Sequence, residues 1–211
     1  MTDQEDYLGR MDKGIVLVDI VMEDLQSAFT DLVTDKSPYH RRTAFRTFFA
    51  AVEGVLFSLK QDLLAEAGDV GYSAGDMALL REESYGLSRK GDLVVQPKFL
   101  RLDEHVLFTM NHFTMTLDEK FAVDVHAPGW ADFRSSLRVR HRLTHPKAPD
   151  DLAVTDPELR SLLKAVEWFK SAVATALEEE GRLKLETAAA LRRMEPPRKR
   201  RSRKVSGRAP R

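Results

Sequence analysis

The segment 133–147, FRSSLRVRHRLTHPK, holds four arginines and two histidines within fifteen residues. A histidine titrates near neutral pH, and a guanidinium binds two phosphate oxygens at once. Arg140, His141 and His145 therefore combine an acid or base with a fixed cation, as chemistry at a phosphodiester requires. The alternative is structural: cations stabilise the carbonyl end of a helix, and His145, which precedes Pro146, caps it.

The spacing limits how these side chains can meet. Five positions along a regular helix rotate a side chain by about 500°, so Arg140 and His145 would point about 140° apart. Pro146 disfavours the α conformation at His145 and is expected to unwind the helix there. A site that uses both residues therefore depends on the geometry of this helix end.

Several other polar residues are either parts of a site or ordinary surface residues. Three further cations are secondary candidates for phosphate contact, with a solvated surface position as the alternative: Arg138, Arg142 and Lys147. His105 and His112 lie seven residues apart, nearly on one helix face, but lack a third metal ligand, so we interpret them as packing or surface histidines. Glu53, in the apolar middle of a predicted helix, is expected at the helix surface, with a buried position as the partner of an arginine as the alternative.

Helical periodicity predicts the elements that position this segment. Apolar residues recur every three or four positions over four long segments: 14–35, 38–67, 97–121 and 130–145. Ser37 with the proline after it begins the second segment, and Pro146 ends the fourth. Asp156 with its following proline begins a final helix that runs to about Gly181, with a continuation through Met194 left open. These elements predict an all-α fold, an up-and-down helix bundle.

The segment 68–97 interrupts the helical pattern with five glycines. A short helix around 76–83 and a small strand at 93–95 are predicted within it. We interpret this segment as a glycine-rich insertion rather than as part of the core.

The composition excludes several classes of protein. The chain has no cysteine, so disulfides, thiolate metal sites and cysteine nucleophiles are excluded. It has no P-loop, dinucleotide fingerprint, nucleophile elbow or zinc-ligand spacing. The acidic N-terminus is unlike a signal peptide, and the apolar run 15–22 is too short to span a membrane. A cytoplasmic protein without a metal or other cofactor is therefore expected.

The zero net charge conceals two oppositely charged parts. Residues 192–211 carry ten basic residues and one glutamate, whereas residues 1–191 carry 23 basic and 32 acidic residues. We predict one helical domain over 1–191 and a disordered basic C-terminal tail over 192–211, which has too little apolar surface to fold. The tail either binds nucleic acid or another polyanion, docks on its own acidic body, or only aids solubility.

The residues Arg140, His141 and His145, inside RHRLTHPK, resemble the signature of HEPN-domain proteins. In that family an arginine and a histidine are separated by four to six residues, and Asn, Asp or His commonly follows the arginine. The context is similar too, because the pair ends the penultimate long helix of an all-α chain, before a loop and a capped final helix. The resemblance covers the bundle from about residue 14 to 181 in outline, and its specific residues lie in 140–147.

The resemblance implies a metal-independent endoribonuclease in which the 2′-hydroxyl attacks and leaves a 2′,3′-cyclic phosphate, with Arg140, His145 and His141 catalytic. It also implies a homodimer that brings two copies of the motif together in a cleft. An RNA substrate, an antitoxin protein as partner and a role in a toxin–antitoxin or phage-defence system would follow. Two alternatives stay open: a non-catalytic dimeric HEPN-like binding or regulatory module, and a nucleic-acid-binding protein that acts through its basic tail.

Overall fold

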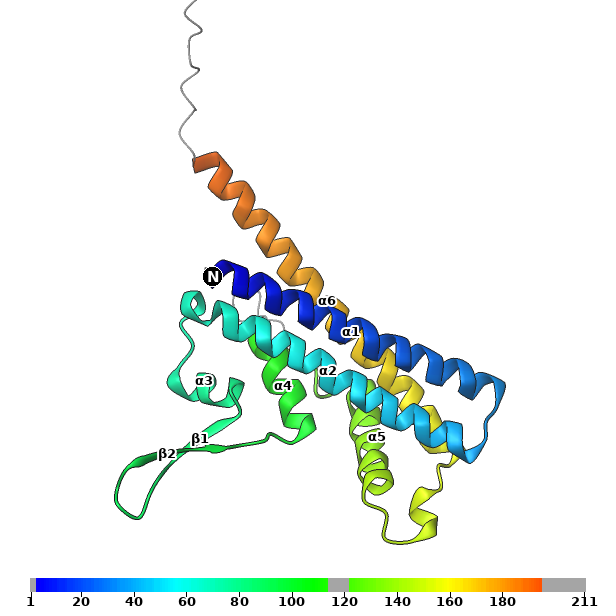
Figure 1. The fold of residues 1–211 in the computed structure, drawn as a ribbon. Helices are drawn as coiled ribbons and strands as arrows, with labels where there is room; N and C mark the ends of the chain where they lie inside the picture. The colour runs from blue at the N-terminus through cyan, green and yellow to red at the C-terminus, as the bar shows by residue number, and fades with distance from the viewer. Residues whose placement is uncertain (1–2, 114–121, 195–211) are drawn as a thin grey trace, which may run out of the picture.

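A computed structural model of the chain describes residues 3–113 and 122–194. Within these residues the fold consists of six α-helices, one 3₁₀ turn and one β-hairpin (Figure 1). The prediction of a mostly α-helical architecture is confirmed, whereas the likeness to a HEPN bundle stays a prediction. In this part of the chain no helix combines the length and the apolar character needed to cross a membrane.

Helices α1 (Asp3–Thr34) and α2 (Pro38–Val70) form a long antiparallel pair (Figure 1). α1 begins well before residue 14, and Val33, predicted on its apolar side, is 79% exposed. α2 ends not at Gly68 but before Gly71, whose φ of 70° is a conformation that glycine adopts without a steric cost. Pro38 occupies the first turn of α2 as expected, but the Ser37 side chain makes no capping hydrogen bond.

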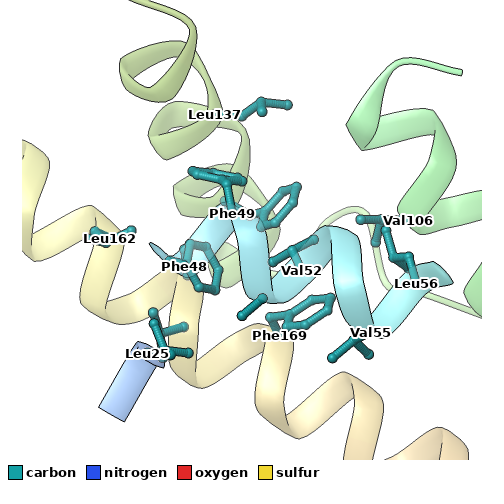
Figure 2. Close-up of a cluster of buried hydrophobic side chains, with 14 of the residues drawn as sticks. Leu25, Phe48, Phe49, Val52, Val55, Leu56, Val106, Leu137, Leu162 and Phe169 are labelled. Atoms are coloured by element: carbon teal, nitrogen blue, oxygen red, sulfur yellow. The ribbon is translucent and has the colours of Figure 1, made fainter. Parts of the chain in front are cut away.

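α2 is the central helix of the core. α1 lies along one side of it, and α4 (Leu102–Phe113) and α5 (Pro128–Thr144) lie on the other (Figure 1). Its apolar side chains, spaced by three and four residues, are almost completely buried: Phe45, Phe48, Phe49, Val52 and Leu56. Figure 2 shows the last four of them among side chains of the neighbouring helices, such as Leu25, Val106 and Phe169. Burying a side chain of this size stabilises the fold by about 1.5–3 kcal/mol, so α2 carries much of the packing energy.

The first turn of α5 approaches α6 (Asp156–Met194) closely. A Cβ added at Gly129 would lie 2.4 Å from Cβ of Trp168, so no larger residue fits there without a shift. The indole of Trp168 contacts the rings of Trp130 and Phe133, at centroid distances of 5.3 and 5.4 Å. This contact fixes α5 against α6 and so sets where the other end of α5 lies.

The segment 68–97 folds as α3 (Ala74–Leu80) and a hairpin of β1 (Glu83–Leu87) and β2 (Leu93–Pro97). The strands are antiparallel, with Tyr85 opposite Val95. The strand β1 was not among the predicted elements. The expectation that the segment lies outside the core was wrong for Leu80, which is completely buried in it. A single leucine in a glycine-rich stretch has no periodicity to indicate burial.

The later helices differ from the predictions mainly at their ends. α4 begins at Leu102 rather than near 97, and the predicted continuation over 114–121 lies outside the described residues. α5 ends at Thr144 as expected, and a 3₁₀ turn, η1 (Pro149–Leu152), leads to α6. The cap of α6 is Thr155 rather than Asp156, because the Thr155 N–H donates to Glu158 Oε2 (2.8 Å) and the Glu158 N–H donates to Thr155 Oγ1 (3.4 Å).

α6 is one continuous helix that includes residues 192–194, so the first three residues of the predicted tail are helical. Its C-terminal part extends beyond the other helices (Figure 1). The remaining residues of the predicted disordered tail, 195–211, lie outside the described residues.

Candidate functional site

The C-terminal end of α5 presents the predicted site residues. Phe133, Leu137 and Leu143 are buried, which leaves the basic side chains on the remaining surface of the helix. The His145 N–H still donates to the His141 carbonyl (3.0 Å), but His145 has left the helical conformation, with φ −127° and ψ 60°. The helical conformation therefore ends before Pro146, as expected.

Arg140 is oriented by a carboxylate from another helix. Its Nη2 lies 2.8 Å from Oε1 of Glu53 on α2, and the arginine side chain is 27% exposed. Glu53 itself is half exposed, so it lies at the helix surface as expected, and it pairs with an arginine there rather than in a buried position. Such a pair holds the guanidinium in one place while its outer N–H groups remain able to donate.

His141 connects Arg140 to His145. His141 lies in the last turn of α5, four positions before His145, where the helical conformation ends. The two rings are close enough for the charge of His145 to act on His141. Partial loss of water around the His141 ring lowers its pKa below the usual value. The positive charges of Arg140 and His145 lower this pKa further. His141 is therefore neutral near pH 7, as a general base must be.

Arg140 and His141 line a pocket of about 460 Å³ between α2, α4 and α5, which we call the polar pocket. Its wall contains charged groups together with aromatic and aliphatic side chains: Glu53, Phe57, Lys60, Glu82, residues 99–103, His105, Leu137, Arg140 and His141. The sequence indicated the α5 part of this wall as a candidate site, but not that Glu53 and His105 belong to the same pocket.

A buried lysine lies at the base of the polar pocket. Lys60 is 5% exposed, and its Nζ pairs with Oε1 of Glu82, which follows α3. Glu82 has a φ of 56°, and its carbonyl accepts a hydrogen bond from the Lys98 N–H (2.7 Å). A non-glycine residue in this conformation is uncommon and marks a position that the surrounding contacts hold in place.

His105 lies beside this ion pair rather than at the protein surface. Burial, and then the positive charge of Lys60, lower the pKa of His105 to about 4. The other histidine of α4, His112, instead donates its Nδ1–H to the Phe108 carbonyl (2.7 Å), and its Nε2 lies 3.3 Å from Asp76 Oδ1. The two histidines therefore do not act together.

Asp103 completes the wall next to His105. Its Oδ2 accepts from Arg101 Nη2 (3.0 Å) and lies 3.9 Å from Arg134 Nε, and the residue is 9% exposed. Asp103 Oδ1 and His105 Nε2 are buried without a hydrogen-bond partner within the described part of the chain. Leaving a buried polar atom unpaired costs about 1–3 kcal/mol, so a ligand that hydrogen-bonds to these atoms would remove this cost.

The secondary candidates are placed differently from one another. Arg138 and Lys147 are exposed, as a phosphate contact requires. Arg142 is turned toward α6, where its Nη2 lies 2.8 Å from Oε1 of Glu158. Its guanidinium thus joins the end of α5 to the cap of α6, and it contributes to the structure whether or not it also contacts substrate.

Sequence reasoning considered Glu53 and His105 separately but did not identify Lys60, Glu82 and Asp103 or bring these residues together in one site. One available signal was Lys60, which lies four positions after Leu56 and three before Leu63, on the buried side of α2. A lysine on an apolar stripe predicts a buried acidic partner. Glu82, 22 residues away, could not be identified as that partner from spacing alone.

Comparisons of the chain with protein-family models, with curated proteins and with solved structures give no significant match.

Proposed function

We propose that this chain is a metal-independent endoribonuclease of HEPN type in which Arg140, His141 and His145 act on the scissile phosphate. The observation that supports it is the arrangement at the end of α5: two imidazoles one turn apart, beside a guanidinium that Glu53 orients. A base, an acid and a cation are the groups that this reaction needs.

Each residue has a distinct role in the proposed step. A ring nitrogen of neutral His141 takes the proton of the 2′-hydroxyl, and the 2′-oxygen attacks phosphorus. Arg140 donates to the phosphoryl oxygens, where negative charge develops. His145 gives a proton to the 5′-oxygen as the P–O5′ bond breaks, so the products are a 2′,3′-cyclic phosphate and a 5′-hydroxyl. Arg138 and Lys147 contact neighbouring phosphates of the RNA.

The active form in this proposal is a homodimer whose two α5 ends face each other across a cleft. Because the end of α5 is exposed, a second copy can approach it, and two sites then share one RNA strand. Sedimentation should give twice the monomer mass at micromolar concentration. A monomer at that concentration would count against the dimer. In a cytoplasmic toxin–antitoxin or phage-defence system, an antitoxin protein would cover the cleft.

The test is RNA cleavage in the presence of EDTA by wild type and by His145→Ala, His141→Ala and Arg140→Lys. Loss of a general acid or base costs about two to four orders of magnitude in rate, and lysine lacks the planar fork that pairs two oxygens. The matched control is His126→Ala, an exposed histidine beyond the opposite end of the 17-residue helix. Equal cleavage by wild type and His145→Ala would assign the activity to a contaminant.

A second candidate function is a non-catalytic binding module. An apolar groove of about 460 Å³ lies between α1, α2 and α6, and Val18, Val55 and Phe169 are among its walls. Intact RNA together with a stable dimer would favour this module. Salt-sensitive RNA binding that is lost when residues 195–211 are deleted would instead favour the third reading, in which the tail acts.

A further inference from the structure

The polar pocket has features that the proposed phosphate chemistry does not use. Arg140 and His141 at its rim suffice for the phosphate, yet the pocket extends to α4, where Asp103 Oδ1 and His105 Nε2 are buried without partners. Asp103 is 9% exposed as a whole residue and its side chain is 13% exposed, and its other oxygen is already paired with Arg101. One acceptor is therefore left for a group that donates a hydrogen bond.

Two phenylalanines line the same pocket and remain accessible. Phe57 on α2 is 46% exposed, and Phe99, just before α4, is 79% exposed. The two rings belong to one pocket wall rather than being scattered singly over the surface. A nucleobase has a flat face that stacks on such rings, and this contact recurs in single-strand recognition.

The charge of the pocket favours an uncharged group in its interior. The cations Lys60, Arg101 and Arg140 are each paired with a carboxylate, from Glu82, Asp103 and Glu53 respectively. His105, between these pairs, is neutral near pH 7. A polyphosphate would find no unpaired cation deep in the pocket. A nucleotide fits these charges better, with its uncharged base inside the pocket and its single phosphate beside Arg140 at the rim.

We infer that the polar pocket is a nucleobase subsite, in which a base carrying an amino group stacks on Phe99 and Phe57 and donates to Asp103 Oδ1 while its phosphate lies at Arg140. The inference rests on the proposed ribonuclease function and assigns that site a preference for adenine, cytosine or guanine over uracil, which has no amino group and whose N3–H lies between two carbonyl oxygens that a carboxylate repels. His105 Nε2 is the second polar group available to the base edge. Both polar atoms lie out of contact with solvent in the free protein, so the side chains around them must rearrange when the base enters.

The test is fluorescence anisotropy with short labelled RNAs of one base each, oligo(A), oligo(C), oligo(G) and oligo(U). The protein is the full chain carrying His145→Ala, which prevents cleavage. Phe99→Ala should weaken binding of oligo(A) about tenfold, in keeping with the loss of one stacked base. Asp103→Asn should remove the preference over oligo(U), because an amide no longer offers only an acceptor. Tyr39→Ala, which removes a 62% exposed ring at the start of α2, is the matched control and should bind like the parent.

The outcomes separate this inference from the proposed function. Cleavage by the wild type together with equal affinity for all four RNAs, or with no effect of Phe99→Ala, overturns the nucleobase subsite alone. If binding is base-selective and depends on Asp103 but the wild type does not cleave RNA, the subsite is supported and the proposed ribonuclease function is rejected. Circular dichroism and thermal unfolding of Asp103→Asn check that its fold is retained, and a variant that unfolds is replaced by Asp103→Glu, which should keep the preference while weakening binding.

Discussion

The buried ammonium of Lys60 on α2 pairs with the carboxylate of Glu82, a residue in the left-handed backbone conformation with a φ of 56°. The two partners differ in burial: Lys60 is 5% exposed, whereas the Glu82 side chain is 33% exposed. The pair joins the α3–hairpin segment to the central helix, and it places two opposite charges beside His105. The stability of the pocket wall therefore depends on this contact.

Removing the two partners separately should have unequal effects. Glu82→Gln leaves a buried lysine unpaired and should cost about 3 kcal/mol, whereas Lys60→Met leaves a partly solvated carboxylate and should cost about 1 kcal/mol. The double variant should be more stable than Glu82→Gln alone. Chemical denaturation of the four proteins measures the coupling energy. Additive effects would show that the pair contributes no coupling to stability.

Acid should destabilise the protein through His105. Its folded-state pKa of about 4 lies below the 6.5 of an ordinary histidine, so the unfolded chain binds the proton more readily. The contribution of neutral His105 to the free energy of unfolding is fully present above pH 6.5 and is lost as the pH falls toward 4. After allowance for partial solvation of the ring, it amounts to about 2 kcal/mol.

The measurement is the free energy of unfolding at several pH values for wild type and His105→Gln. The slope between pH 6.5 and 4 should be smaller in the variant, since glutamine does not titrate. The control is His126→Gln, at an exposed position. Identical slopes in wild type and His105→Gln would contradict the neutral, buried state of His105.

Arg140 should lower the pKa of His141. Desolvation is the larger cause of the shift, and the positive charge of Arg140 is the next. In Arg140→Gln the pKa of His141 should therefore rise toward the ordinary value without reaching it. NMR titration of the ring protons measures this directly, and Lys164→Gln on α6 is a charge control outside the polar pocket. No change in Arg140→Gln would mean that the guanidinium is not near the ring.

Gly129→Ala should destabilise the fold. The added Cβ would lie 2.4 Å from the Trp168 side chain, so α5 must move away from α6, at a cost of about 1–3 kcal/mol. The matched control is Gly75→Ala, also at the second position of a helix, where the nearest atom is 3.6 Å away. Thermal unfolding should show a lower Tm for Gly129→Ala and an unchanged or higher Tm for Gly75→Ala. Two variants of equal stability would refute the close approach.

Local sequence patterns determined much of the helical architecture. The three- and four-residue spacing of Phe45, Phe49 and Val52 predicts which side of α2 is buried, because the period of a helix is a local property. Pro146 similarly determined the end of α5, since its ring restricts only the preceding residue. The nearness of His141 to His145 also follows from one turn of helix. Helix starts were less predictable, as the cap at Thr155 shows.

Only the tertiary structure decided what surrounds these residues. Glu53 and Arg140 are 87 positions apart, and no periodicity in either helix indicates that they meet. The low pKa of His105 depends on burial between packed helices and on a lysine from α2, so its sequence neighbours could not indicate it. A spacing pattern determines how side chains are arranged around one helix axis. Contacts between side chains of different helices depend on the angle at which the helices cross. Packing against α2 and the contact of Gly129 with Trp168 set that angle for α5.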